Sequence, residues 1–486
     1  MVQAPDIVLF MTDQQRYDQV GYRSGGFYET PALDGLARRG VVFRNAYSAA
    51  ATCIPARIGL LTGVQPRRLP TQPDSIGLRE GVWTVAHALR AAGYETALVG
   101  KMHFTPVHAQ HGFQYMRTSE HLGATTLGRA PDGTPDPDDY HAWLVAQGIA
   151  EWGELEIGKA PEVRPVRPAG VGKVPFPYEL AYHPTTWVAD EVRRFLEQRR
   201  DDRPLFLVVS FPHPHTPLNP LGSYATKYDV AETVVPAVGY EANAGLPEVF
   251  RDAIDGSAAS YVPWRVHEHG ESALRLRQTQ VRALVSQLDD ALGDLLPRFP
   301  LDRTVVAFTS DHGDYAGHRG LGGKAPWIPF DDLVRVPLVL AGAGIAQDRQ
   351  SEALVQSCDL PLTFCELAGV TLPVDDAEFD SCSLTPHLGD APPEGLGDRA
   401  ARFLYNSGWP GARLGGAKLI CHWPSWTKML FDLDRDPDET VDVSADPAYA
   451  DTLRELESIV WEGLLREPPV VLTDWAAVAP GGRSGD

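Results

Sequence analysis

Cysteine is scarce in this chain, with five residues among 486. Four of them are scattered without the spacing of a metal site: Cys358, Cys365, Cys382 and Cys421. An odd and scattered set also argues against the disulfide framework of a small secreted protein. The fifth, Cys53, stands apart near the N-terminus.

An excess of positive charge and a long apolar run are also missing. The formal net charge is −21, from 43 Lys and Arg against 64 Asp and Glu, which argues against a nucleic-acid or anionic-membrane partner. No apolar run approaches the length of a membrane span. Met1 to Pro5 leads directly into an apolar segment without a basic start or an export signal, so we expect a cytoplasmic protein.

Two apolar segments, far apart in the chain, each end in polar side chains. Asp6 to Asp13 is followed by Gln14, and Val305 to Ser310 is followed by Asp311 and His312. Short continuous apolar runs are typical of strands buried on both faces of a parallel sheet. In open α/β sheets, ligands collect at the carboxyl ends of the strands. We therefore expect four side chains to converge there: Asp13, Gln14, Asp311 and His312.

This convergence predicts a site for one divalent cation. Carboxylate and amide oxygens suit a hard cation, calcium first or magnesium, whereas an imidazole shifts the preference toward manganese or zinc. The alternative is that an Asp or His after a strand only caps a helix or fills a turn. Either pair alone fits that alternative, but two such pairs together favour the cation.

The most informative segment is Cys53-Ile54-Pro55-Ala56-Arg57. A Cys two residues before a Pro and four before an Arg resembles the maturation motif of the formylglycine-dependent (type I) sulfatases, which belong to the alkaline phosphatase superfamily. Ala56 departs from that motif, where a small hydroxyl residue is commoner. The alternative reading of a lone buried Cys is inert packing. Pro55 suits the first turn of a helix, whose N-terminal amides would face an anion.

The resemblance implies a maturation step and a chemical role for this segment. A formylglycine-generating enzyme would oxidise Cys53 to an aldehyde, and the residue would also be a ligand of the cation. Arg57 would support the formylglycine and its metal-bound oxygen. The hydrated aldehyde would attack the sulfur of a sulfate ester, which is nucleophilic catalysis through a covalent intermediate.

Three more segments resemble catalytic elements of the same family. Gly100 to His103 resembles its glycine-lysine-any-histidine element, and Pro214 to Pro217 resembles its proline-histidine-any-proline element. In the second element His215 matches, and His213 is the weaker choice. Lys324 resembles the second sulfate-binding lysine.

The resemblance also implies roles for these side chains. Lys101 and Lys324 would hold sulfate oxygens, because an anion must be brought to a nucleophile by fixed positive charge. His215 would supply the proton to the leaving alcohol, and His103 would help the remaining hydroxyl to expel sulfate. Taken singly, each residue also fits a surface lysine or a structural histidine.

The sequence thus predicts a sulfatase that converts a small organic sulfate monoester into an alcohol and inorganic sulfate. Gln14 and His312 stand where sulfatases usually have a second Asp and often an Asn. This variant resembles choline sulfatases, phosphonate monoester hydrolases and some bacterial arylsulfatases. A phosphonate monoester hydrolase or phosphodiesterase with the same formylglycine is therefore the alternative, although Lys101 and His103 argue against it. A non-catalytic binding protein with an unoxidised Cys53 is a third possibility, which no residue supports.

The predicted fold is α/β: a large mixed, mostly parallel sheet sandwiched by helices, alkaline phosphatase-like, over residues 1–400. Residues 401–486 would form a small C-terminal α+β subdomain with an antiparallel sheet, including strand-like runs at 403–406, 417–421 and 429–433 and a helix at 448–466. Helices are also expected at 31–39, 83–92, 183–198 and 272–296. Two irregular stretches, about 111–182 and 217–272, would cover the mouth of the site or form surface insertions. The apolar tail at 468–479 is a candidate contact in a homo-oligomer.

Overall fold

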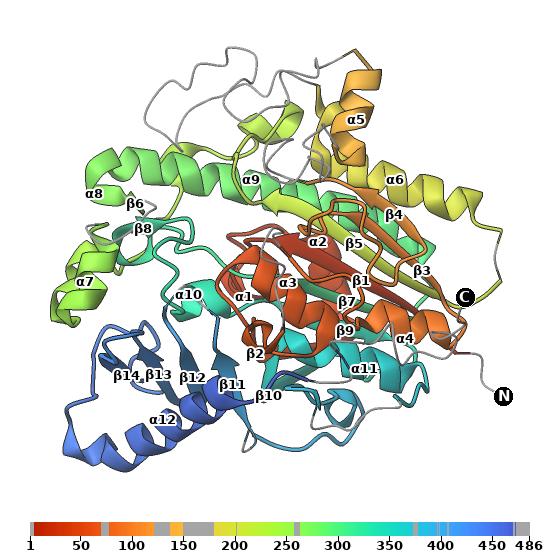
Figure 1. Cartoon of the computed structure of the whole chain (residues 1–486). Coiled ribbons are helices and arrows are strands. Elements are labelled where there is room, and N and C mark those ends of the chain that lie inside the picture. The colour runs from red at the N-terminus through yellow and green to blue at the C-terminus, as the bar shows by residue number, and fades with distance from the viewer. Residues whose placement is uncertain are drawn as a thin grey trace.

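The structure is a computed structural model that describes residues 4–69, 77–120, 137–148, 179–200, 202–256, 263–372, 378–395, 397, 399–405, 408–469 and 472. Its centre is an eight-stranded sheet in the order β10-β2-β9-β7-β1-β5-β3-β4 (Figure 1). In chain order these strands are β1 (Asp6–Asp13), β2 (Gly40–Tyr47), β3 (Glu95–Gly100), β4 (Tyr115–Thr118), β5 (Leu205–Pro214), β7 (Thr304–Ser310), β9 (Leu338–Gly342) and β10 (Arg349–Gln356).

Neighbouring strands of this sheet run parallel except at β9, which is antiparallel to both β2 and β7. β1 lies inside the sheet, parallel to β5 on one side and to β7 on the other. The sheet is therefore mixed and mostly parallel, which confirms the predicted fold class.

The side chains of β1 explain why helices must cover both faces. Ile7, Leu9 and Met11 pack into one hydrophobic core, whereas Val8 and Phe10 pack into another. Successive side chains of a strand point to opposite faces, so the unbroken apolar run from Ile7 to Met11 needs cover on both. This is the physical reason why the sequence of β1 specifies an interior position.

Helices from distant parts of the chain provide that cover. One core is closed by α3 (Cys53–Thr62), α4 (Val85–Ala91) and α11 (Leu360–Leu367), and the other by α2 (Pro31–Arg38), α6 (Pro184–Gln198) and α9 (Glu271–Leu295). Figure 1 shows α6 and α9 along one side of the sheet, with α4 and α11 on the other. The four predicted helices in this region agree with α2, α4, α6 and α9 within two residues at each end.

A separate antiparallel sheet lies in the C-terminal region, as predicted. It contains β11 (Ala400–Phe403), β12 (Gly411–Leu414), β13 (Ala417–Cys421) and β14 (Lys428–Asp432), and α12 (Ala450–Leu465) packs against it. The strand expected at 403–406 was placed too late. Phe403 pairs with Gly411 as the last residue of β11, and the chain then leaves the ladder.

The remaining elements are short: α1 (Gly21–Ser24), α5 (Asp139–Ala146), α7 (Glu248–Ile254), α8 (Val266–His269), α10 (Asp331–Val334), β6 (Trp264–Arg265) and β8 (Leu321–Gly322). The stretch at 111–182 contains β4 and α5, and the stretch at 217–272 contains α7, β6 and α8. Residues 121–136 and 149–178 of the first stretch and 257–262 of the second lie outside the described residues, and the role of the two stretches over the site stays a prediction. In the part of the chain that the structure describes, no helix is long and apolar enough to cross a membrane.

Candidate active site

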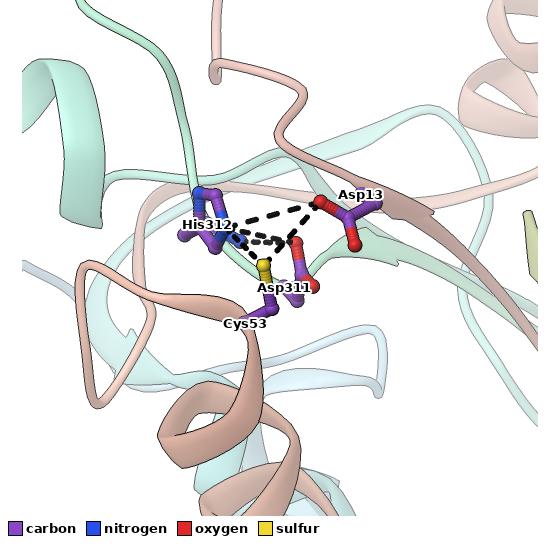
Figure 2. Close-up of side chains that lie close together, drawn as sticks. All are labelled: Asp13, Cys53, Asp311 and His312. Carbon is purple, nitrogen blue, oxygen red and sulfur yellow. Dashed lines mark hydrogen bonds and ion pairs between the residues drawn. The ribbon is translucent and has the colours of Figure 1, made fainter. Parts of the chain in front are cut away.

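The carboxyl ends of β1 and β7 bring two buried carboxylates together. The strands pair in parallel register with Thr12 opposite Ser310, so Asp13 and Asp311 follow side by side. The first residue of α3, Cys53, faces the same edge. Four residues each offer one ligand atom within 4.8 Å of the others: Asp13, Cys53, Asp311 and His312 (Figure 2).

The orientation of His312 fits a cation ligand. Its Nδ1 lies 2.8 Å from the carbonyl oxygen of Gly313, which can only accept, so Nδ1 carries a proton, and in the neutral imidazole Nε2 presents its lone pair to the cluster. Nε2 lies 3.1 Å from the Sγ of Cys53 and 3.9 Å from the Oδ1 atoms of both Asp13 and Asp311. Two carboxylates and an imidazole around one centre fit a divalent cation.

Arg57 balances the charge of the two carboxylates from within the protein. It is 1% exposed, and it donates from Nε to Asp311 Oδ2 at 2.9 Å and from Nη2 to Asp13 Oδ2 at 3.2 Å. Its Nη1 donates to Ser210 Oγ at 2.9 Å and to the carbonyl oxygen of Lys101 at 2.5 Å. Arg57 lies one helical turn after Cys53 on α3, and residues four apart share a helix face.

Lys101 is a second buried cation, and it contacts Asp13, one of the two carboxylates that Arg57 binds. Its Nζ lies 2.6 Å from Asp13 Oδ2. Burial and Cys53 oppose ionisation of Asp13, but nearby cations, of which Lys101 is the strongest, hold the pKa of Asp13 well below its ordinary value. Burial and the adjacent Asp13 raise the pKa of Asp311. The pair therefore behaves as two like charges that need a shared counterion.

Lys324 and His215 form a contacting pair beside the sulfur of Cys53. The Nζ of Lys324 lies 2.9 Å from Cys53 Sγ and 3.1 Å from His215 Nε2. His215 Nδ1 lies 2.7 Å from the carbonyl oxygen of Thr216, so Nε2 is the acceptor for Lys324. Burial and Lys324 lower the pKa of His215, which leaves the imidazole neutral. Burial alone would raise the pKa of the Cys53 thiol, but Lys324 and further cations bring it well below its ordinary value.

His103 lies in a turn whose backbone N–H groups are bound by the buried carboxylate of Glu120. Its side chain is hydrogen-bonded to Cys53, and burial and Lys101 lower its pKa to about 3. Its φ of 67° is in the left-handed region. The Oε1 of Glu120 accepts from the backbone N–H groups of Met102 at 2.9 Å and His103 at 2.8 Å. Glu120 was not among the predicted site residues, because it belongs to no motif and lies 17 positions after His103 in the chain.

Two predicted residues, Gln14 and His213, are placed differently from the rest. Gln14 has a φ of 66°, donates its backbone N–H to Asp311 Oδ1 at 3.1 Å, and donates from Nε2 to Asp314. His213, the weaker choice, stacks on His183 with ring centroids 4.5 Å apart. The structure thus gathers the predicted catalytic residues around Asp13, Asp311 and His312, and Gln14 joins them through its backbone N–H.

Comparisons with known proteins agree with this geometry. A family model described as Sulfatase matches residues 5–370, which include the whole cluster. An arylsulfatase of Clostridium perfringens is 29% identical over 385 residues, which cover 76% of this chain and 76% of that protein. A choline-sulfatase of Rhizobium meliloti is 28% identical over 474 residues, covering 94% and 87%. The solved structure of a phosphonate monoester hydrolase from Silicibacter pomeroyi has the same fold, with a TM-score of 0.76 at 21% identity over 96% of this chain and 97% of that one.

Proposed function

This chain belongs to the sulfatase family and is a sulfuric ester hydrolase, and on that premise we propose that it hydrolyses a small organic sulfate monoester with a formylglycine made from Cys53. The alcohol and inorganic sulfate are the products. A formylglycine-generating enzyme of the host is the partner required for maturation.

One observation carries this proposal: the surroundings of the Cys53 sulfur. Lys324 Nζ lies at 2.9 Å and His312 Nε2 at 3.1 Å, with an oxygen of Asp13 at 3.7 Å. A sulfur or oxygen at this position therefore has both a cationic donor and a candidate metal site beside it. An inert core cysteine would have apolar neighbours instead.

The fixed cations prepare the site for an anion. Lys101 and Arg57 neutralise Asp13 and Asp311, while Lys324 stands next to His215. A divalent cation held by Asp13, Gln14, Asp311 and His312, together with residue 53, would supply Lewis-acid stabilisation of negative charge. We propose calcium first for its oxygen ligands, with manganese or magnesium as alternatives, since an imidazole also favours manganese.

His215 supplies the proton for the leaving oxygen after its Nε2 has received that proton from the ammonium group of Lys324, which is left as a neutral amine. The pKa of His215 is lowered, so its Nε2 is an acceptor, and Lys324 donates to it in the free protein. An ester oxygen that binds beside this pair would lie next to a hydrogen-bond donor, the Nζ of Lys324. His103, which also contacts residue 53, has a pKa of about 3, so its imidazole is neutral and can accept a hydrogen bond from a hydroxyl at this position.

A cytoplasmic location and self-association through residues 468–479 remain parts of the proposal. All five cysteines lie among the described residues and are free thiols, which agrees with a reducing compartment. Cell fractionation and sedimentation analysis of the chain with and without residues 473–486 test these two points.

A phosphonate monoester hydrolase or phosphodiesterase is the alternative function. Gln14 and His312 favour it, and the fold agrees with a solved structure of that description. Against it, Lys101 and His103 are both present in the buried cluster around residue 53, where they suit a sulfate ester.

The test is a comparison of kcat/KM for 4-nitrophenyl sulfate, a 4-nitrophenyl phosphonate monoester and bis-4-nitrophenyl phosphate. The protein must carry a formylglycine at residue 53 that has been verified by peptide mass. We expect the sulfate ester to be preferred by at least about tenfold, which is about 1.4 kcal/mol of transition-state stabilisation. A preference for either phosphorus ester of that size would replace the proposal by its alternative.

A further inference from the structure

Asp314 is a buried carboxylate just beyond the predicted site, two residues after His312. It is 4% exposed and accepts from four donors. Its Oδ2 accepts from Gln14 Nε2 at 2.5 Å and from Arg277 Nη2 at 2.7 Å. Its Oδ1 accepts from the backbone N–H groups of Ala316 at 2.6 Å and Gly323 at 3.0 Å.

The first pair of contacts decides which atom Gln14 turns toward the cation site. An ionised carboxylate only accepts hydrogen bonds, so the Gln14 atom beside Asp314 must be the amide nitrogen. Oε1 is then the atom left for a cation. The other three partners of Asp314, the Arg277 guanidinium and the backbone N–H groups of Ala316 and Gly323, can only donate, so both of its oxygens act as acceptors.

The second pair of contacts fixes the turn that carries Lys324. Gly323 has a φ of 75°, in the region that favours glycine, and its N–H is held by Asp314. The next residue, Lys324, reaches Cys53 Sγ at 2.9 Å. The carboxylate of Asp314 therefore contacts a predicted cation ligand, Gln14, and also the turn that carries a predicted sulfate-binding lysine, Lys324.

We propose that Asp314, with Arg277 as its counterion, is a positioning residue that presents the Oε1 of Gln14 to the cation and holds the Lys324 turn. This inference rests on the proposed function, because it requires that Gln14 is a cation ligand. Asp314 does not touch the reacting atoms; it acts through the two residues that it orients.

Asp314→Asn is the informative substitution. If the new side chain keeps its oxygen toward the two backbone N–H groups, its NH2 faces Gln14, and the Gln14 amide must rotate so that its oxygen accepts. Gln14 would then present NH2 instead of oxygen to the cation. We expect the affinity for Ca²⁺ and Mn²⁺ to fall by about 10–100-fold, as for other outer-shell partners of metal ligands.

Cation affinity is measured by calorimetric titration of Ca²⁺ and of Mn²⁺ into chelator-stripped protein, so the readout does not depend on turnover. Asp289→Asn is the matched control, since Asp289 is also a buried carboxylate that accepts two backbone N–H groups, from Ala32 and Leu33 at 2.9 Å each. It should leave the affinity unchanged. Thermal unfolding of both variants shows whether they are folded.

A double-mutant cycle separates positioning from general damage. If Asp314 acts through Gln14, Asp314→Asn should weaken cation binding in the wild type but have no further effect when Gln14→Ala is already present. An equal effect in both backgrounds, or wild-type affinity in a folded Asp314→Asn protein, overturns the inference. Failure of the wild type itself to bind either cation would instead refute the metal site in the proposed function.

Discussion

The Nζ of Lys324 lies 2.9 Å from the Sγ of Cys53, although 271 positions separate the two residues in the chain. Lys324 follows a turn downstream of β7, and Cys53 begins α3. The contact places a fixed positive charge at the atom that oxidation would convert into the nucleophile. This contact also distinguishes Cys53 from a cysteine that only packs in an apolar core.

Replacing Lys324 by Ala should lower kcat/KM for a sulfate ester by about 10²–10³, the usual cost of one preorganised donor to a developing charge. Cation affinity should change little, because Lys324 is not a predicted ligand. Lys227→Ala is the control, since Lys227 forms a partly exposed ion pair with Glu29 at 3.1 Å. A kcat/KM of the Lys324→Ala variant within about threefold of the wild-type value would contradict the sulfate-binding role of Lys324.

Replacing Arg57 by Ala should destabilise the protein strongly when no divalent cation is bound. Asp311 would lose its buried counterion, and Asp13 would keep only Lys101; breaking a buried pair on one side typically costs about 3–5 kcal/mol. A bound cation compensates both carboxylates, so the loss should be smaller in excess Ca²⁺ or Mn²⁺ than in chelator. Denaturant titrations of wild type and variant in both conditions measure this difference, and an equal loss in the two would contradict the shared-counterion account.

Replacing Asp311 by Asn should lower cation content and turnover together. The substitution removes a charge from the candidate ligand set and weakens the hold of Arg57. Elemental analysis after gel filtration, alongside kcat, gives both numbers from one preparation. Asp451, an exposed residue of α12 in the C-terminal region, provides the Asp451→Asn control. Full cation content in the Asp311→Asn protein would count against its ligand role.

Replacing Glu120 by Gln should make folding stability less dependent on pH. Burial raises the pKa of Glu120 from 4.5 to about 7 in the folded protein. The folded state therefore keeps a proton that the unfolded chain releases, so the stability from this group is full below about pH 4.5 and declines as the pH rises toward 7.

The substituted glutamine side chain cannot ionise, and it keeps an oxygen for the two N–H groups of Met102 and His103. The unfolding free energy of Glu120→Gln relative to wild type should therefore rise by about 2 kcal/mol between about pH 5 and about pH 8. Denaturant unfolding at several pH values measures this difference. A difference that does not change with pH would contradict the shifted pKa.

The sequence predicted the parts of the fold that depend on local pattern. β1 and β7 each contain an unbroken apolar run, Ile7 to Met11 and Val305 to Phe308, which is enough to place them inside a sheet covered on both faces. The reversal of β9 could not be predicted, because its direction depends on which strand it meets and not on its own residues. The end of β11 was misplaced for a similar reason, since its partner β12 decides where the ladder stops.

The candidate site was predictable where residues belong to motifs and not where they act through packing. Cys53, Lys101 and His215 stand in short patterns that can be read along the chain. Glu120 contacts the site through the backbone of the Lys101 turn, and Asp314 contacts it through the side chain of Gln14. Such contacts join segments that only the folded chain brings together.

The most direct test of the account is the rate of sulfate release from 4-nitrophenyl sulfate in preparations that differ in their formylglycine content at residue 53. The content is measured by peptide mass, and Cys53→Ala supplies the preparation with none. The account predicts a rate per protein that rises in proportion to this content and falls nearly to zero in the folded Cys53→Ala variant. A rate that is independent of formylglycine content, or that persists in Cys53→Ala, would contradict the assignment of residue 53 as the nucleophile.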